Sequence, residues 1–264
     1  MTAVSRLANI ALVLGSAPDV VRCKGWPRLP FKTIIAINNA WLVRPDFDYL
    51  LHAGDFPEER LPTGESTRSA FVVSSREYVP AQNAFGGFVY AGGTMAFTTA
   101  YWVIHRLRPD ILAFLGCDMV YEPENGQTHF YGQGTADPLR DDVTLRSLEA
   151  KSARLFVQAL RAGTLCVNLS RLPASRLIFP RLDFSILHSI SKSDAAAMRR
   201  GYEEDIDPAS AIAGEQMERR LGYFVEDGRY WKQIDRFDPE CLRQIDDYWF
   251  SSLGRIAKPE PADS

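Results

Sequence analysis

Short apolar runs, rich in β-branched and aliphatic residues, recur along the first two thirds of the chain. The best defined of them stop at a glycine or an asparagine. Runs of about five residues without polar alternation are typical of strands that are buried on both faces of a parallel sheet. On this basis we predict strands at residues 10–14, 33–37, 47–51, 70–73, 111–115 and 165–169.

Segments with helix signals separate these runs. Pro18 suits the first turn of a helix after the first strand, because the N–H that it lacks is not needed there. Thr94 is predicted to cap the helix before the fifth strand, and Asp141 or Asp142 to cap a longer helix that ends at Gly163. Strands alternating with helices predict right-handed βαβ units and therefore a doubly wound, mostly parallel, Rossmann-like α/β sheet.

The pattern divides the chain into three parts. Residues 1–184 carry the strand and helix alternation and form the predicted Rossmann-like domain. Within it, residues 119–140 are a long polar loop, which in a compact domain is usually functional and here predicts a lid. Residues 185–257 are helical, charged and rich in aromatic side chains, which we expect to pack against one edge of the sheet or in a homo-oligomer contact. Residues 258–264 are predicted to be a disordered tail.

Charge, hydropathy and cysteine content mainly argue against certain classes of protein. The 30 basic and 33 acidic residues give a formal net charge of −3. Because the basic residues do not cluster, no nucleic-acid partner is expected. No run approaches the ~20 apolar residues of a membrane span, and the apolar start reads as a strand and turn rather than as a secretion signal. The four cysteines are far apart, which favours a reduced, cytoplasmic setting.

Small and polar residues follow the first two predicted strands, at the edge where open α/β sheets bind ligands. Gly15 and Ser16 begin a turn that opens a helix, and such a turn can present backbone N–H groups to a phosphate. The turn is neither a GxGxxG nor a P-loop motif, and an ordinary strand–helix turn is the alternative. Asn38 and Asn39 can hydrogen-bond a ribose, a base or a sugar hydroxyl, or they can serve a turn in which Asn tolerates left-handed geometry.

Two further segments are predicted to reach the same edge. Gly93 and Thr94 start a helix, where glycine allows close approach of a ligand and threonine caps the helix. Asp118 follows the fifth strand and could either orient a ligand or hold the loop after it. Asp46 and Asp48 form a DxD pattern, but they precede a strand and therefore lie at the wrong end of the sheet. No histidines have metal-ligand spacing, so no metal site is expected.

The loop after the fifth strand holds the candidate catalytic residues. His129 is the expected general base, because an imidazole with an ordinary pKa of about 6.5 suits proton transfer near neutrality. Tyr121 and Tyr131 flank it. Their phenols could donate to phosphate oxygens and stabilise a leaving phosphate without a metal, or they could anchor the loop by packing.

The order and spacing of these elements resemble two related groups of proteins. The elements are GSAP, an asparagine after the second strand, GGT, GCDMVY, THFYG and the pair CVNLS and PASRL. They are similar to the bacterial sialyltransferases of glycosyltransferase family 42. They also resemble the domain shared by the flagellar motility accessory factors and the archaeal 6-hydroxymethylpterin pyrophosphokinases. The resemblance covers roughly residues 8–180.

The resemblance implies a single α/β domain with a flexible lid and a metal-independent, inverting transfer from CMP-sialic acid. It implies His129 as the base and Tyr121 and Tyr131 as ligands of the leaving phosphate. The residues that would hold the nucleotide are Gly15, Ser16, Asn38, Asn39, Gly93 and Thr94. His129 lies between the two tyrosines, whereas the sialyltransferase histidine follows them. This order is closer to the accessory-factor branch and weakens the case for sialic acid more than the case for a nucleotide.

We therefore predict a glycosyltransferase that uses a nucleotide-activated sugar, CMP-sialic acid or a related nonulosonic acid, without a prosthetic group. Its acceptor would be a glycan or a lipid-linked glycan in surface-polysaccharide synthesis, and its location cytoplasmic or peripheral at the inner membrane. One alternative is an ATP-dependent diphosphokinase that uses Mg²⁺, with Asp118 as a metal ligand. The other is a non-catalytic nucleotide-binding or scaffold protein.

Overall fold

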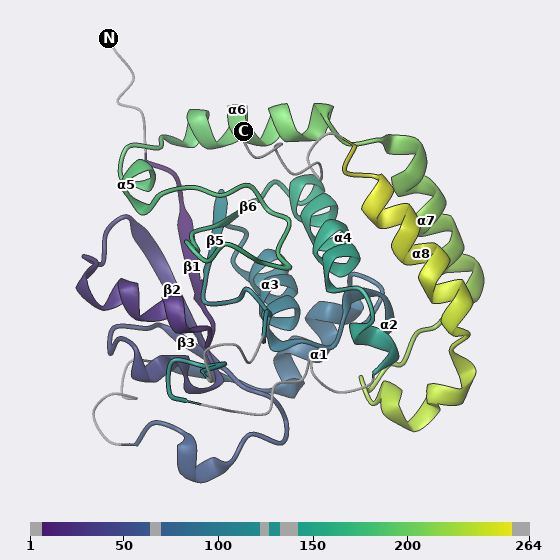
Figure 1. Ribbon diagram of the computed structural model, residues 1–264, viewed down its shortest axis with the longest axis horizontal. Helices are drawn as coiled ribbons and strands as arrows, with labels where there is room; N and C mark the ends of the chain where they lie inside the picture. The colour runs from purple at the N-terminus through teal and green to yellow at the C-terminus, as the bar shows by residue number, and fades with distance from the viewer. Residues whose placement is uncertain (1–6, 64–69, 122–126, 133–141, 255–264) are drawn as a thin grey trace.

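The computed structural model describes residues 7–63, 70–121, 127–132 and 142–254. Six strands form one all-parallel sheet in the order β4-β3-β2-β1-β5-β6 (Figure 1). The strands are β1 Ile10–Leu14, β2 Phe31–Ile37, β3 Tyr49–Leu51, β4 Phe71–Val73, β5 Ile111–Leu115 and β6 Leu165–Asn168. All six lie close to their predicted bounds, and the predicted α/β, Rossmann-like class is confirmed.

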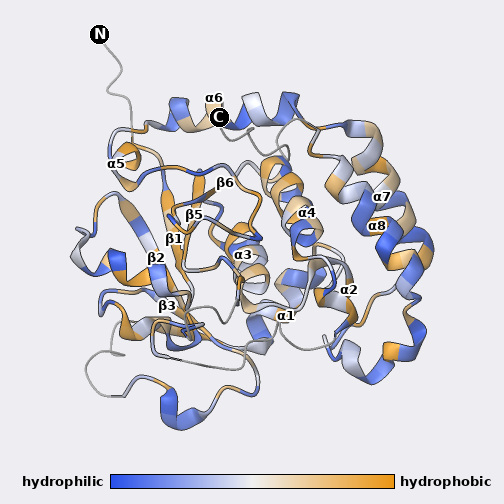
Figure 2. Ribbon diagram, in the orientation of Figure 1, coloured by the Kyte–Doolittle hydropathy of each residue, from blue (hydrophilic) through white to orange (hydrophobic). Residues whose placement is uncertain are grey.

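The burial of each strand follows from its place in the sheet. β1 pairs with β2 on one side and with β5 on the other, and every residue of β1 and β5 is buried. These central strands are hydrophobic along their whole length in Figure 2. β4 lies at an edge, where Phe71 and Val72 are exposed. A continuous apolar run therefore marks the middle of this sheet, as expected for parallel strands covered on both faces.

The connections divide into two groups by direction. Among the described residues, the chain steps from β1 to β4 through the 3₁₀ helices η1 Pro18–Gly25, η2 Asn38–Leu42 and η3 Glu58–Arg60. It then crosses back to β5 and on to β6 through α1 Ser75–Asn83, α2 Phe88–Ala91, α3 Met95–Arg106, η7 Val143–Leu145 and α4 Leu148–Arg161. Because parallel crossovers are right-handed, steps in opposite directions lie on opposite faces. The sheet is therefore doubly wound, with α3 against β1 and β2 and α4 against β6.

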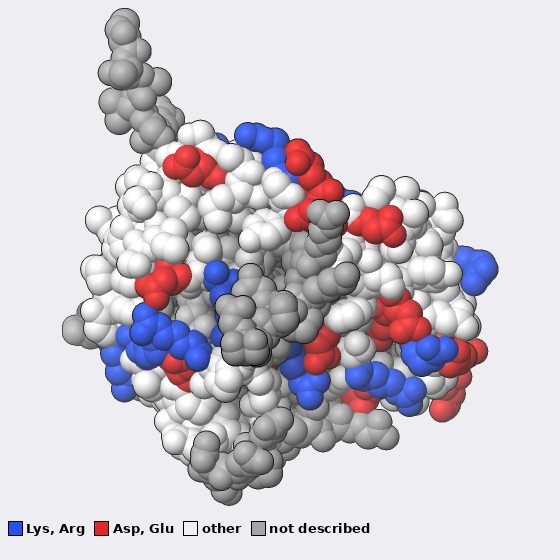
Figure 3. Space-filling view, turned by 45° about the horizontal axis from the view of Figure 1, so that its top comes forward, with Lys and Arg blue, Asp and Glu red and all other residues white. Residues whose placement is uncertain are grey.

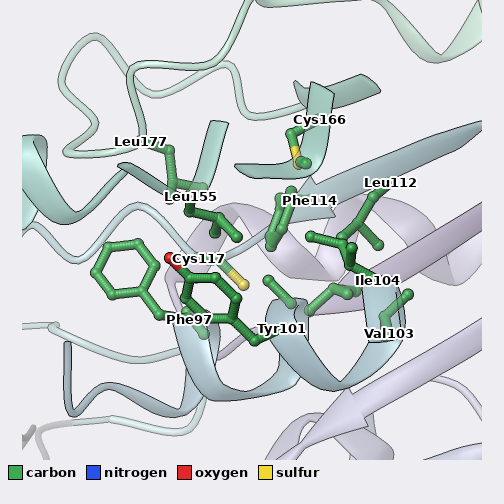
Figure 4. Close-up of a cluster of buried hydrophobic side chains, with 14 of the residues drawn as sticks. Phe97, Tyr101, Val103, Ile104, Leu112, Phe114, Cys117, Leu155, Cys166 and Leu177 are labelled. Carbon is green, nitrogen blue, oxygen red and sulfur yellow. The ribbon is translucent and has the colours of Figure 1, made fainter. Parts of the chain in front are cut away.

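One large apolar cluster fills the space between the sheet and the helices. Figure 4 shows Phe97 and Tyr101 of α3 in the same cluster as Phe114 of β5 and Leu155 of α4. Cys117 and Cys166 belong to it as well, and both are free, buried thiols. Cysteine in such a setting behaves as a small apolar residue.

The predicted helix signals agree with the structure at Thr94, Gly163 and Pro18 and differ from it at Asp142. Thr94 caps α3 by accepting a hydrogen bond from the Phe97 N–H at 3.2 Å, and Gly163 follows the end of α4 with a φ of +88°. The first crossover is a 3₁₀ helix, with Pro18 at its start as predicted. Asp142 caps only η7, by accepting from the Thr144 N–H at 2.8 Å.

The cap of α4 is Ser147, whose hydroxyl accepts a hydrogen bond from the Ala150 N–H at 3.3 Å. The prediction of a cap at Asp142 was wrong because a 3₁₀ turn intervenes, so that the α-helix begins several residues later. The other candidate cap, Asp141, lies outside the described residues, as does most of the predicted lid and the predicted tail.

The C-terminal extension is helical and lies against α4. Its elements are α5 Phe184–Leu187, α6 Lys192–Glu204, α7 Pro208–Leu221, η8 Tyr230–Arg236 and α8 Pro239–Ser251. α6 contacts β6 at the edge of the sheet, and α8 contacts both α4 and α7 (Figure 1). In Figure 2, hydrophilic and hydrophobic residues alternate along α7 and α8. These helices therefore bury one face and expose the other.

Two buried ion pairs join the extension to α4. Lys151 Nζ lies 2.8 Å from Asp246 Oδ1 of α8, and Arg154 Nε lies 2.8 Å from Glu218 Oε1 of α7. The indole N–H of Trp249 also donates to Glu218 Oε1, at 2.7 Å. The cations on the outer face of α4 require acidic partners once they are buried. The position of α7 and α8 is thus set by charge as well as by apolar packing.

Candidate functional site

A cleft of about 240 Å³ opens at the carboxyl ends of β1 and β5. The chain leaves β1 toward β2, while β5 lies on the other side of β1. These strand ends therefore flank the topological switch point, where open α/β sheets bind ligands. Seven of the ten predicted site residues line the cleft: Gly15, Ser16, Asn38, Thr94, Tyr121, His129 and Tyr131.

The turn after β1 is attached to β5 through its backbone. The Gly15 N–H donates to Leu115 O, and the Ala17 N–H donates to Gly116 O, both at 2.9 Å. Pro18 has no N–H. Within the described part of the chain, only Ser16 of this turn keeps its N–H without a backbone acceptor. The prediction of several N–H groups facing a phosphate was wrong, because the neighbouring strand end occupies them.

Gly15 is required by the same attachment. A Cβ at this position would lie 2.2 Å from Gly116 O and 2.7 Å from Cys117 Sγ. The glycine therefore serves the close contact between two strand ends.

Gly15→Ala is expected to destabilise the protein by about 1–3 kcal/mol, because overpacking forces the backbone of β5 to move. Gly201→Ala is the matched control, since a Cβ at this residue of α6 meets nothing within 4 Å. That control should leave stability unchanged or raise it by about 0.5–1 kcal/mol. Urea unfolding midpoints of the two variants measure the difference. Equal midpoints would show that the backbone around Gly15 can accommodate a Cβ without loss of stability.

The two asparagines after β2 have different surroundings. Asn38 has a φ of 49°, and its Oδ1 accepts a hydrogen bond from the Ala53 N–H at 3.1 Å. This bond joins the ends of β2 and β3 while leaving Asn38 in the cleft lining. Asn39 is buried in η2 and does not line the cleft. The expectation that both side chains face a ligand is therefore corrected for Asn39, because the 3₁₀ turn rotates it inward.

The start of α3 also separates two neighbouring candidates. Thr94 lines the cleft in addition to capping its helix. Gly93 lines a second groove instead, and a Cβ there would lie 2.6 Å from Tyr230 Oη and 2.8 Å from Thr144 Oγ1. Gly93 is thus needed for the approach of a tyrosine from the C-terminal extension, and its predicted contact with a nucleotide in the cleft is corrected.

Asp118 points away from the cleft. Its side chain is fully buried, and Oδ1 lies 3.5 Å from Asn168 Nδ2 at the end of β6. Burial raises the pKa of the Asp118 carboxyl above its ordinary value. The Asp118 carbonyl accepts a hydrogen bond from the Arg176 N–H at 2.9 Å. Of the two roles considered for this residue, holding the loops after β5 and β6 agrees with its position, and ligand contact in this cleft does not.

His129 is held between two tyrosines. Its ring centroid lies 5.7 Å from that of Tyr121 and 5.0 Å from that of Tyr131, with the planes inclined by 30° and 29°. His129 exchanges two backbone hydrogen bonds with Gly132, each of 3.0 Å. The next residue, Phe130, donates its N–H to Ser16 O at 2.9 Å. The imidazole is therefore fixed above the turn after β1 by its own backbone.

The protonation state of His129 suits a base. Burial lowers the pKa of the imidazole below its ordinary value of 6.5, so the ring is neutral at pH 7. Nδ1 lies 2.8 Å from Thr128 Oγ1. In the tautomer whose Nδ1–H donates to this hydroxyl, Nε2 keeps its lone pair and can take a proton. Tyr131 is 44% exposed and can reach a ligand at the mouth of the cleft.

Several lining residues were not singled out as candidates. Asp55, which follows β3, places an exposed carboxylate at the rim, and Met95 and Cys117 line the wall. Burial raises the pKa of the Cys117 thiol, which keeps it protonated and unreactive. The position of Asp55 just after a strand was the signal that could have identified it. Among the described residues, no three His, Cys, Asp or Glu side chains are grouped as metal ligands.

Charges of both signs are mixed on one face of the molecule (Figure 3). Figure 3 shows Lys and Arg interspersed with Asp and Glu on one face, without a field of a single sign among the residues described there. In the part of the chain that the structure describes, no helix has the length and apolar content needed to cross a bilayer.

The fold and the cleft together define a Rossmann-like α/β protein with a histidine and two tyrosines at its switch point. No family model matches the chain, and comparisons with curated proteins and with solved structures found no match.

Proposed function

We propose that this protein is a glycosyltransferase that uses a nucleotide-activated sugar, with a CMP-linked nonulosonic acid such as sialic acid as the donor. The observation that carries the proposal is the stacked arrangement of Tyr121, His129 and Tyr131 over the turn after β1. A neutral imidazole and two phenols in a switch-point cleft supply a base and two hydrogen-bond donors. A base and hydrogen-bond donors of this kind can support inverting transfer of a sugar without a metal.

Each group has a role in the proposed reaction. His129 removes the proton from the acceptor hydroxyl as that oxygen attacks the anomeric carbon of the donor. The bond from the anomeric carbon to the phosphate oxygen breaks, and the nucleoside monophosphate departs with the electron pair. Tyr121 and Tyr131 donate hydrogen bonds to the phosphate oxygens, on which negative charge develops. Ser16 and Asn38 contact the nucleotide from the strand ends below.

A thermal-shift screen tests the proposed donor. CMP, CDP, UDP, GDP and ATP are each added with and without Mg²⁺. CMP at about 100 times its dissociation constant is expected to stabilise the protein by about 2.7 kcal/mol, without Mg²⁺. For a domain of this size, the melting temperature then rises by roughly 5–10 °C.

Two results of the screen would contradict the proposal. A shift given only by ATP together with Mg²⁺ would favour a diphosphokinase. No shift with any nucleotide would favour a scaffold protein, in which the cleft holds no nucleotide.

A further inference from the structure

A second groove, of about 1000 Å³, adjoins the cleft. Ala53, Asp55 and Met95 line both hollows, so the two are adjacent. One wall of the groove comes from the Rossmann-like domain. The other comes from the C-terminal extension, which contributes Tyr230, Trp231 and Ile234. The cleft alone is smaller than the roughly 300–1000 Å³ of typical ligand sites. A transferase needs space for a second substrate beside its donor, and this groove supplies it.

The wall from the extension is held rigidly. Tyr230 Oη donates to Asp142 Oδ2 at 2.9 Å, and its ring stacks on Phe88 with the centroids 6.2 Å apart. Gly228 lies against Phe88 so closely that a Cβ there would come within 3.0 Å of that ring. Trp231 follows Tyr230, with its ring edge-on to the tyrosine at 5.5 Å. The indole, 58% exposed, therefore lies beside a tyrosine that Asp142 and Phe88 hold in position.

Apolar and polar side chains both line the groove, without a dominant charge. Its charged lining residues are Asp55, Arg76, Asp142, Asp227 and Arg229. The charges of three carboxylates and two guanidiniums nearly cancel, so the groove does not favour a polyanionic ligand. Carboxylates and guanidiniums beside an exposed indole match the two sides of a sugar, its hydroxyls and its apolar C–H face.

We propose that this groove binds the acceptor as a neutral oligosaccharide, with one sugar ring stacked on Trp231. The role of the groove as an acceptor site rests on the proposed transferase function. Binding of an oligosaccharide to the groove can be tested without any donor. The sugar hydroxyls bond to Asp55 and Arg76 along the groove. The reactive hydroxyl then reaches the shared rim of the cleft, where His129 takes its proton.

Binding of lactose, cellobiose and maltose, measured by saturation-transfer NMR and calorimetry without nucleotide, tests the groove. The wild-type protein is expected to bind at least one of the three at millimolar concentration. Trp231→Ala should weaken that binding about tenfold, because the stacking surface is lost. Trp231→Phe should retain most of the affinity. Phe250→Ala removes a similarly exposed aromatic residue of α8, outside this groove, and should change nothing.

The outcomes separate the two proposals. Binding of no disaccharide, or equal binding by Trp231→Ala and the wild type, would overturn the groove as a carbohydrate site even when CMP binds. Disaccharide binding lost in Trp231→Ala would support the groove even when no nucleotide binds, while the proposed transferase would then fail. When both ligands bind, Trp231→Ala should raise the acceptor KM about tenfold and leave donor hydrolysis by water unchanged.

Discussion

Replacing His129 by alanine is expected to lower the rate of sugar transfer by a factor of about 10² to 10⁴ and to leave nucleotide binding largely intact. In the proposed reaction the imidazole takes a proton, whereas the proposed nucleotide contacts, Ser16 and Asn38, are unchanged in this variant. The measurements are initial rates of transfer and thermal shift with CMP. His105→Ala is the matched control, because His105 is exposed on α3 outside the cleft, and its transfer rate should equal that of the wild type.

The pH profile gives a second measure of the same residue. Because burial lowers the pKa of His129 below 6.5, activity should stay level across neutral pH and fall only at lower pH, as the base becomes protonated. The free energy of unfolding should also decrease as the pH falls. The neutral ring favours the folded state above the unfolded pKa, and this contribution is lost as the pH falls through the lower folded pKa. Unchanged transfer in His129→Ala would remove His129 from the mechanism.

Arg154→Met is expected to lower the free energy of unfolding by about 3–5 kcal/mol. The guanidinium contacts both carboxylate oxygens of Glu218, at 2.8 and 2.9 Å, and donates to Tyr101 Oη at 2.8 Å. Methionine fills a similar volume but leaves the Glu218 carboxylate buried without its cation. The melting temperature should fall by roughly 10 °C, as calorimetry would show.

Two further variants separate the charge effect from the loss of packing. Adding Glu218→Gln to Arg154→Met removes the unpaired carboxylate and should recover part of the lost stability. Arg243→Ala breaks exposed pairs with Glu240 and Asp247, and because water screens such pairs it should leave the unfolding temperature nearly unchanged. If Arg154→Met unfolded at the same temperature as Arg243→Ala, the buried pair would not hold α7 against α4.

The sequence was a good guide to the sheet because its strands are buried on both faces and therefore read as unbroken apolar runs. It was a poorer guide to short helices. α1 begins with a capping box, in which Ser74 and Glu77 bond each other's backbone, and that pattern is visible in the sequence. Pro80 in its interior obscured the helical signal. Nothing local indicated that the first crossover would be a 3₁₀ helix.

The sequence predicted that the site lies at the strand ends, but it did not predict which way each side chain points. The order of turns along the chain brought Ser16, Asn38 and His129 to one cleft, because parallel strands end at the same edge. Asp118 was misplaced because its direction depends on the backbone around it, where Gly116 and Met119 both have positive φ. The loss of free N–H groups at Gly15 depended on the register between β1 and β5, which no local pattern specifies.

The ion pairs on α4 are contacts that the C-terminal helices must break in order to detach from the domain. Proteins open in cooperative segments whose free energies range from near zero to the global value. An opening that detaches α7, η8 and α8 together would break both ion pairs and the Tyr230 contacts with Asp142 and Phe88, while the strands around His129 stay folded. Amide exchange in these helices would then report how long the groove remains assembled. A molecule that contacts both walls of the groove would stabilise the closed state and slow that exchange. Amides of α7 and α8 would then be protected by a ligand that they do not contact.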